Sequence, residues 1–431
     1  MIDYIRSSIP WLDSIPSHWA ESRLKDIGQA RNGLTYKPED IVDSDNGTIV
    51  LRSSNIQNSK LSFEDNIFVA SFPEELRVRC NDVIICSRNG SVSLVGKCAL
   101  IENDIDATFG AFMMRFRTNI NPKFTFYLLQ TTIAAYKGLF GTTTLNQLTT
   151  SVFGNMLTCI PPLEEQEAIA GYLDKECGNI DRKIELMERK TDAYSRLRRS
   201  LINRAVTRGL NPVVPLKFSG NDWIGDIPEH WNVKPLRSFI TLISPDKKEV
   251  NDYQLLSVTR DKGVIIRGER GEDGNNNRIP DDLSNYKVVR KNQFVINKMK
   301  AWMGSYGVSD YEGIVSPAYF ICNVHNIYEP FLSIAIRSKL YTNFFWKYSK
   351  GIRVDQWDMS PLALKEIPFV TPPEDEQREI VAYLDEKCGK IDAIREEIEK
   401  EVERLKELKR SLINEVVTGK RAIKLSEVSY D

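Results

Sequence analysis

The stretch PPLEEQEAIAGYLDKECGNID at residues 161–181 is followed about 211 residues later by PPEDEQREIVAYLDEKCGKID at residues 372–392. The agreement continues in register to RRSLINRAVT at residues 198–207 and KRSLINEVVT at residues 409–418. Upstream, WLDSIPSHW at residues 11–19 matches WIGDIPEHW at residues 223–231. Self-similarity at such a long period predicts two tandem halves. Each half then consists of an IP-x-HW segment, a long variable block and a repeated helix.

Each repeated stretch is predicted to begin a long helix. The pairs Pro161-Pro162 and Pro372-Pro373 are followed by more than 40 residues without proline, and prolines are common where a helix begins. The acidic residues that come next suit the positive end of a helix dipole. Gly178 and Gly389 interrupt both helices at the same point and would permit a bend.

Large apolar residues recur every seven positions along both helices. This spacing keeps one seam turned toward a partner helix, so it predicts that the two helices pack on each other as a coiled coil. The residues of this seam are Leu173, Ile180, Met187, Tyr194 and Leu201 in the first helix, and Leu384, Ile391, Ile398, Leu405 and Leu412 in the second.

The variable blocks at residues 20–160 and 232–371 contain short β-branched runs bounded by Asn, Asp and Gly, which are typical of strands. Examples are GTIVLRSSNI at 47–56, NDVIICSRNG at 81–90, KGVIIRGE at 262–269 and NQFVINKMK at 292–300. The predicted fold class is α/β (α+β), with a pseudo-twofold repeat. The predicted divisions are a strand-rich domain at 1–160, a helix at 161–209, a second strand-rich domain at 210–371, a helix at 372–420 and a tail at 421–431. Because the two blocks differ strongly in sequence on a shared frame, we expect them to bind different things.

The composition allows two domains and excludes several protein classes. The chain has 431 residues, of which 42% are hydrophobic, enough for more than one core. It contains no run of 18 apolar residues and no basic segment followed by an apolar one at the N-terminus, so neither a membrane span nor a secretory signal is expected, and the expected compartment is the cytoplasm. The net charge of −1 is low for a nucleic-acid binder. Residues 182–208 nevertheless carry nine Lys or Arg against three Asp or Glu, a stripe that could face phosphate or simply be a solvated helix face.

The cysteines and histidines do not predict a metal site. The seven cysteines form no CxxC pair and there are three histidines, so no zinc ligand set is evident. Cys177 and Cys388 occupy equivalent repeat positions. We expect them to be buried thiols in a reducing compartment; a disulfide between the domains is the alternative.

Residues that follow the predicted strands are suited to contacting nucleic acid. Arg and Lys can read guanine edges, Asn and Gln adenine edges, and Ser and Thr can bind phosphates. Each is also ordinary in a polar loop. The candidates in the first block are Arg52, Ser53, Asn55, Gln57, Ser87, Arg88, Asn89, Thr143, Asn146 and Gln147. Those in the second block are Lys298, Lys300, Trp302, Arg353, Gln356 and Trp357.

Motifs for catalysis were not found. GSVSLVGKC at residues 90–98 is similar to a phosphate-binding loop, but its glycine spacing differs and Cys98 stands where Ser or Thr would bind Mg²⁺; a strand-turn-strand is the preferred interpretation. No GxGxxG, GxSxG or HExxH is present. NPKF at 121–124 and NPVV at 211–214 lack the second proline expected of a methyltransferase acting on a base amino group. The sequence therefore predicts no active site.

Over its full length the chain resembles the specificity subunits of type I restriction-modification systems. The resemblance rests on IPSHW and IPEHW, on PPLEEQEAIAGYLD and PPEDEQREIVAYLD, on SLIN near both helix ends, and on the two unlike blocks between them. It implies two target-recognition domains, each reading one half of a split sequence in double-stranded DNA. It also implies that the two helices pack antiparallel and act as a ruler between the half-sites.

The resemblance further implies which partners and cofactors to expect. Two methyltransferase subunits would dock on the chain and modify adenine with S-adenosylmethionine, optionally with two motor-nuclease subunits that use ATP. The chain itself would be non-catalytic and would hold no cofactor or metal. Its near-neutral charge indicates that partner subunits supply part of the phosphate clamp. Two alternatives are an enzyme that acts alone on DNA and a coiled-coil scaffold that does not bind DNA.

Overall fold

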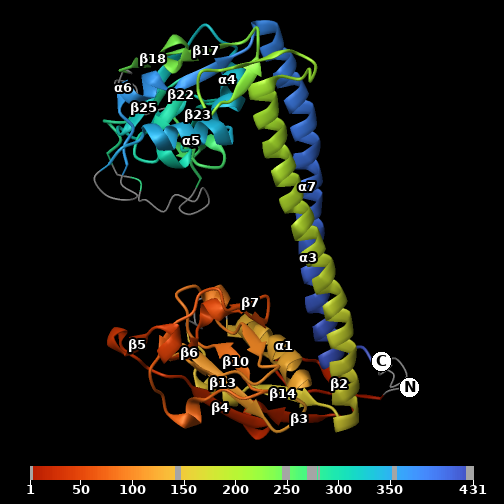
Figure 1. Ribbon diagram of the computed structural model, residues 1–431. Helices are drawn as coiled ribbons and strands as arrows, with labels where there is room; N and C mark the ends of the chain where they lie inside the picture. Colours follow the sequence, from red (N-terminus) through yellow and green to blue (C-terminus); the bar gives the residue numbers. More distant parts are fainter. Residues whose placement is uncertain are drawn as a thin grey trace. The chain divides into compact units, whose positions relative to one another are not determined.

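The computed structural model describes residues 3–140, 147–244, 253–268, 279, 282–351 and 357–423. The chain divides into two compact units (Figure 1): unit 1 comprises Met1–Met187 and Lys400–Asp431, and unit 2 comprises Glu188–Glu399. Two long helices, α3 (Leu163–Arg208) and α7 (Glu374–Val417), contribute residues to both units. No helix in the described ranges combines the length and apolar character needed to cross a bilayer.

Unit 1 is built on two four-stranded sheets. The main sheet is antiparallel and has the order β11 (Cys98–Leu100), β10 (Val83–Cys86), β13 (Met113–Thr118) and β4 (Gly28–Asn32). The second sheet has the order β12 (Ala107–Phe109), β6 (Thr48–Leu51), β9 (Phe68–Val69) and β5 (Ile41–Val42), with β12 and β6 parallel. All four residues of β10 are buried, as expected for a β-branched run covered on both faces. The helices of the block are α1 (Pro122–Phe140) and α2 (Thr150–Gly154).

Unit 2 repeats this main sheet with different residues. Its order is β18 (Ile240–Ile243), β25 (Tyr319–Val324), β22 (Phe294–Asn297) and β23 (Tyr306–Val308), all antiparallel. Two smaller pairs join β19 (Leu256–Thr259) to β20 (Gly263–Ile266) and β21 (Lys287–Val289) to β24 (Gly313–Val315). The helices are α4 (Glu329–Ile336), α5 (Lys339–Tyr348) and α6 (Pro361–Glu366). The predicted mixed class of helices and strands is confirmed.

Each variable block begins and ends in one two-stranded sheet. In unit 1, β3 (Ala20–Arg23) pairs with β14 (Leu157–Ile160), and the outermost partners are Ala20 and Ile160. In unit 2, β17 (Asn232–Pro235) pairs with β26 (Pro368–Thr371), from Asn232 opposite Thr371. Both ends of a block are therefore hydrogen-bonded to each other before the chain enters the long helix.

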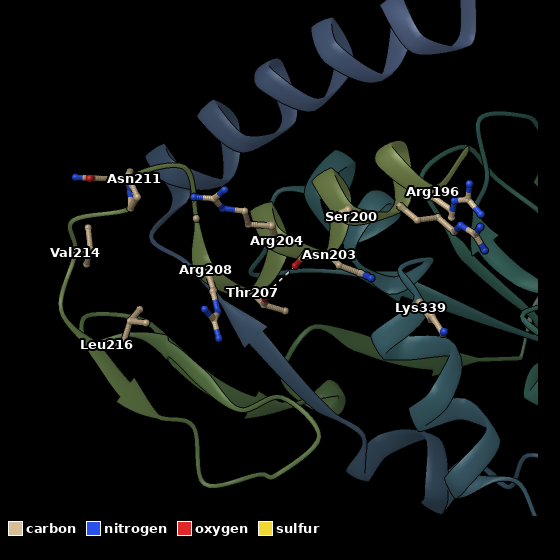
Figure 2. A pocket seen from close by; sticks show the side chains of 13 residues that line it. Arg196, Ser200, Asn203, Arg204, Thr207, Arg208, Asn211, Val214, Leu216 and Lys339 are labelled. Carbon is tan, nitrogen blue, oxygen red and sulfur yellow. Dashed lines mark hydrogen bonds between the residues drawn. The ribbon is translucent and has the colours of Figure 1, made fainter. Parts of the chain in front are cut away.

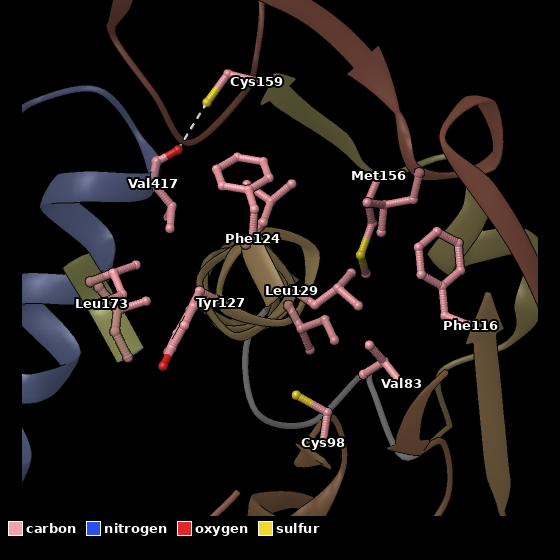
Figure 3. Close-up of a cluster of buried hydrophobic side chains, with 14 of the residues drawn as sticks. Val83, Cys98, Phe116, Phe124, Tyr127, Leu129, Met156, Cys159, Leu173 and Val417 are labelled. Carbon is pink, nitrogen blue, oxygen red and sulfur yellow. Dashed lines mark hydrogen bonds between the residues drawn. The ribbon is translucent and has the colours of Figure 1, made fainter. Parts of the chain in front are cut away.

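The core of each unit contains residues from both long helices. In unit 1, Leu173 near the start of α3 and Val417 at the end of α7 belong to the same buried cluster as Phe124 of α1 (Figure 3), and the Cys159 thiol donates to the Val417 carbonyl oxygen at 3.5 Å. In unit 2, Val206 near the end of α3 and Leu384 near the start of α7 share a second cluster. Each core is thus completed by the helix end of the other half of the chain.

The seven-residue seam lies within these cores or beside them. Leu173, Ile180, Met187, Leu405 and Leu412 lie in the cluster of unit 1 or pack against it. In unit 2, Leu384 lies in the cluster, Leu201 packs against it, Ile391 and Ile398 are buried, and Tyr194 is half-buried. Lys409 Nζ lies 2.7 Å from Asp181 in unit 1, and Arg198 Nε lies 3.1 Å from Asp392 in unit 2. A residue later in α3 thus contacts a residue earlier in α7, so the two helices are antiparallel.

Gly178 and Gly389 lie inside α3 and α7, and each of these continues through its glycine as a single helix. The expected buried thiols are confirmed and the alternative of a disulfide is wrong: Cys177 and Cys388 are free and lie in the cores of different units. Burial raises the pKa of the Cys177 thiol to about 11 and also raises the pKa of Cys388, so both remain protonated near neutral pH.

Candidate nucleic-acid interface

The doubled segment carries a Glu-Gln pair that ties each long helix to its own block. Glu165, in the first turn of α3, accepts a hydrogen bond from Trp19 Nε1 at 3.0 Å and contacts His18 at 2.7 Å. In unit 2, Glu376 accepts from Trp231 Nε1 at 2.9 Å and contacts His230. Within each unit, the IP-x-HW segment is therefore bonded to the start of the long helix.

The glutamine after each of these glutamates makes two further hydrogen bonds. Gln166 donates to the Pro161 carbonyl oxygen at 2.8 Å and accepts from the backbone N–H of Asn121, just before α1, at 3.1 Å. Gln377 donates to Pro372 at 2.9 Å and accepts from the backbone of Tyr328, just before α4, at 3.0 Å. Both glutamines are buried. Because both glutamines contact the blocks through backbone atoms, these two contacts can be kept by blocks of different sequence.

In unit 1, loops from three strand ends meet around one cavity of about 1040 Å³. Arg52 follows β6, Arg88 and Asn89 follow β10, and the turn from Gly110 to Phe112 connects β12 to β13. The Phe112 carbonyl oxygen accepts from the backbone N–H groups of Ser87 and Arg88 at 2.9 and 3.1 Å. The Asn89 amide donates to Ser53 Oγ at 3.0 Å. Four of the predicted residues, Arg52, Ser53, Arg88 and Asn89, line this cavity.

The chemistry of this cavity suits contact with bases. The Arg88 guanidinium lies over the Phe112 ring, 5.4 Å from its centroid, and the Phe112 side chain is 58% exposed. Arg52 is held by Asp65 at 2.9 Å, which fixes its position and neutralises part of its charge. An arginine fork, an amide and an exposed ring are the groups that read base edges and stack on bases.

Other residues predicted in the first block lie elsewhere. Asn55 is fully buried, and its amide bonds Arg52 N, Ser62 O, Asp65 O and Asn66 Oδ1. A DNA contact by Asn55 does not fit this burial, because the amide is used to hold the loop together. Ser87 is also buried. Gln57 is exposed on β7 (Ile56–Gln57), and Gln147 is exposed beside Arg88. Thr143 and Asn146 lie outside the described residues.

Unit 2 brings together the corresponding loops. Lys298 follows β22 as Ser87 follows β10, and the backbone N–H of Met359 donates to Lys298 O at 3.0 Å, as Leu148 N donates to Ser87 O at 2.7 Å. Both partners in unit 2 lie about 211 residues after those in unit 1. Lys298 Nζ is 3.1 Å from Asp358, whereas Lys300 is exposed. Arg353 and Gln356 lie outside the described residues.

Three tryptophans gather at these loops, and we call Trp302, Trp346 and Trp357 the tryptophan cluster. The centroids of Trp302 and Trp357 are 5.4 Å apart, and those of Trp346 and Trp357 are 5.7 Å apart, both edge to face. Trp346 is 49% exposed. The same position in the fold thus presents arginine, amide and Phe112 in unit 1, but lysines and indole rings in unit 2.

Three aromatic residues at these sites were not predicted from the sequence: Tyr36 and Phe112 at the cavity of unit 1 and Trp346 in the tryptophan cluster. Phe112 stands beside the buried strand β13 and looks like a core residue in sequence. The exposure of Trp346 could have been predicted from the sequence. The helix α5 buries Phe344 and Phe345, so Trp346, which is followed by Lys347, falls on the polar face of an amphipathic helix.

Other chemistry is not evident. No group of His, Cys, Asp and Glu suited to a metal ion occurs in the part of the chain that the structure describes. In the GSVSLVGKC segment, Lys97 Nζ donates to the Ile56 carbonyl oxygen at 2.9 Å, and burial lowers the pKa of Lys97. Its ammonium is already bound within the protein, which supports the structural interpretation of that segment.

Comparison with known proteins agrees with this arrangement. The family model of the type I restriction modification DNA specificity domain matches residues 16–193. The specificity subunit of the type I restriction enzyme StySPI from Salmonella potsdam is 23% identical over 433 residues, covering 94% of this chain and 89% of that protein. The EcoKI specificity subunit from Escherichia coli (strain K12) is 27% identical over 200 residues, covering 44% of this chain and 43% of that protein. A solved chain from a study of assembly and conformational transition in the type I R-M system has a TM-score of 0.63 at 17% identity, covering 94% of this chain and 99% of that one, and shares its fold.

Proposed function

We propose that this chain, which is similar to the specificity subunits of type I restriction enzymes, is the sequence-reading subunit of such a complex, with one half of a split DNA target read by each unit. The observation that carries this is the pair of matched loop positions. Arg88 and Asn89 in unit 1 follow β10, and Lys298 and Lys300 in unit 2 follow β22, which is the equivalent strand of the equivalent sheet. A shared frame with different reading groups fits two different half-sites.

Methylome sequencing of a host with and without this gene tests the proposal. One split motif should lose its methylation when the gene is removed. Methylation by the isolated chain would instead favour an enzyme that acts alone. A reconstituted complex that binds DNA without dependence on salt, or does not bind it, would favour a scaffold, since phosphate contacts make affinity fall as salt rises.

Lys300 offers a test of the reading site in unit 2. It is exposed, while the neighbouring Lys298 is paired with Asp358. If Lys300 contacts a guanine edge, Lys300→Ala should cost about 1–3 kcal/mol of binding free energy and relax one position of one half-site. Competition binding with a duplex library measures both effects. An equal loss over all sequences, with a shallower salt slope, would assign Lys300 to phosphate instead.

A repeated surface supports a proposal for the finer composition of the complex. Leu197 on α3 and Leu408 on α7 occupy equivalent repeat positions and are 47% and 55% exposed. Exposed leucines repeated at the same place on two helices suit two copies of one partner. We therefore assign one methyltransferase subunit to each of these two helix faces. In the same proposal, S-adenosylmethionine and ATP bind to the partner subunits and not to this chain.

Two single substitutions test this stoichiometry. Leu197→Glu and Leu408→Glu should each weaken the docking of one methyltransferase by about 2 kcal/mol, the size of an interface hot spot, and mass photometry should then show complexes with a single copy. Leu186→Glu is the matched control: Leu186 is 62% exposed, and the equivalent repeat position holds Glu397. Retention of both copies by both variants would contradict the assignment.

A further inference from the structure

The end of α3 forms a strongly basic pocket within unit 2 (Figure 2). The pocket has a volume of about 820 Å³ and lies between the last turns of α3, the segment that leads to β15 (Leu216–Phe218), and the start of α5. We call it the basic pocket, after its five cationic residues Arg196, Arg199, Arg204, Arg208 and Lys339. The described residues that line it include no Asp or Glu.

The cations of this pocket have no acidic partner among the residues that the structure describes. Arg199 Nε donates to the Ser195 carbonyl oxygen at 3.2 Å, and none of the five forms an ion pair with a residue in the ranges that the structure describes. Elsewhere on the long helices, cations commonly have acidic partners, such as Lys390 with Glu386 at 2.7 Å and Lys406 with Glu403 at 2.8 Å. Five unpaired positive charges around one hollow repel each other, and a bound anion would relieve that repulsion.

The fold itself does not require these charges. At the equivalent positions of α7, the polar residues Ser200, Asn203 and Thr207 recur as Ser411, Asn414 and Thr418. Of the four arginines only Arg199 recurs, as Arg410, whereas Arg196, Arg204 and Arg208 correspond to Glu407, Glu415 and Gly419. Since α7 has two glutamates and a glycine where α3 has these three arginines, most of the positive charge is specific to α3.

Helix electrostatics account for only part of the cluster. Cations near a helix C-terminus are favourable, which covers Arg204 and Arg208. Lys339 has the opposite placement, because it is the first residue of α5, where a positive charge meets the positive end of the dipole. An anion in the pocket would be attracted both by Lys339 and by that helix end.

The nature of the anion follows from the other groups. Guanidinium groups bind phosphate through paired N–H donors, and hydroxyl and amide groups from Ser200, Thr207 and Asn203 also line the pocket. No aromatic ring is among its described lining residues, so nothing there would stack on a base. The pocket suits phosphates rather than bases.

The position of Lys339 relates the pocket to the proposed DNA face. Trp346 of the tryptophan cluster follows Lys339 by seven residues on α5. Residues seven apart project from the same face of a helix, about 10 Å apart along its axis, which is less than one turn of a DNA duplex. One duplex could therefore touch both.

We propose that the basic pocket binds phosphates of the DNA backbone beside the half-site that unit 2 reads, and that it supplies affinity without reading sequence. This inference rests on the proposed function. It also places much of the phosphate-binding charge of a near-neutral chain at one helix end.

The test is the double variant Arg196→Glu/Arg204→Glu in the complete complex with its methyltransferase subunits. It introduces the residues that α7 carries at the same positions, so the helix end is expected to fold. Affinity for a duplex containing the methylated motif should fall roughly 10- to 100-fold at low salt, and the salt slope should become shallower by about 2. The motif and the number of bound subunits should not change. Lys183→Glu/Lys190→Glu, with the same change of charge on α3 outside the pocket, is the control and should keep the wild-type slope.

Three outcomes would overturn this inference. Unchanged affinity and slope would show that no DNA phosphate binds in the pocket. Loss of a methyltransferase subunit from the double variant would assign the pocket to an acidic segment of that partner. Displacement of DNA from the wild type, but not from the variant, by nucleoside triphosphate at low concentration would point to a free nucleotide. Absence of salt-dependent DNA binding by the wild-type complex would instead refute the proposed function itself.

Discussion

Exchange of residues 20–160 for the corresponding block of a relative is expected to change one half of the methylated sequence and to leave the other half unchanged. The two ends of this block, Ala20 and Ile160, are paired with each other in one sheet, so a new block closes at the same place. One contact with α3 does not depend on side chains in the block, since Gln166 bonds the backbone of residue 121. Methylome sequencing of the exchanged protein gives the result directly.

The reciprocal exchange provides the control. Residues 232–371 have the same closure, with Asn232 opposite Thr371, and their exchange should change only the other half of the motif. A change in both halves after either exchange would show that the two units do not read independently. Loss of all methylation, with the complex still assembled, would place part of the reading outside the blocks.

Replacement of Trp231 by alanine should destabilise unit 2 by about 3–5 kcal/mol, the range for large aromatic residues in a core. The side chain is fully buried, and its indole N–H donates to Glu376 at 2.9 Å. The Trp231 ring also packs closely against the end of α3, because a Cβ atom added at Gly209, the residue after α3, would lie 3.1 Å from the ring. The substitution therefore leaves a cavity and removes a donor from a carboxylate. Urea unfolding followed by circular dichroism measures the loss.

Two further variants serve as a comparison and a control for this loss of stability. Trp19→Ala should have a comparable effect on unit 1, because Trp19 is also buried and donates to Glu165 at 3.0 Å. Trp346→Ala, at an exposed position, should change stability by no more than about 0.5 kcal/mol. A loss below about 1 kcal/mol for Trp231→Ala would mean that the IP-x-HW segment does not support the core.

The features visible in sequence were those set by local or periodic patterns. The doubled PP-x-x-EQ segments and the seven-residue spacing predicted two long helices, because helix starts and seams depend on neighbouring residues. The strand ends were also placed well enough to bring Arg88 and Lys298 to matched loops. What the sequence could not give was the side-chain environment: Asn55 looks like a reading residue and is buried, whereas Phe112 looks like core and is exposed. Both depend on how loops distant in sequence fold onto one another.

The likeness of the two blocks was hidden for a similar reason. Their residues differ, so no pattern comparison related β10 to β22, yet the hydrogen bond from Leu148 to Ser87 recurs from Met359 to Lys298. Backbone pairing preserves the fold while the side chains at strand ends vary. The function of the Glu165-Gln166 pair was equally inaccessible, because its partners, Trp19 and the backbone at residue 121, are joined to it only in the folded chain.

Because each core is completed by the other half of the chain, the end of each long helix lies where the other half begins. In unit 2, α3 ends and the chain passes through residues 209–215 into β15, which pairs with β16 (Asp226–Pro228). In unit 1, α7 ends beside β1 (Tyr4–Arg6), which pairs with β2 (Ser14–Pro16), and Tyr4 Oη donates to the Gly419 carbonyl oxygen at 2.8 Å. The two places are equivalent: the chain itself makes the connection in unit 2, and a hydrogen bond joins the two segments in unit 1. A circular permutant with its new ends within residues 209–215 should therefore keep the contacts of both units.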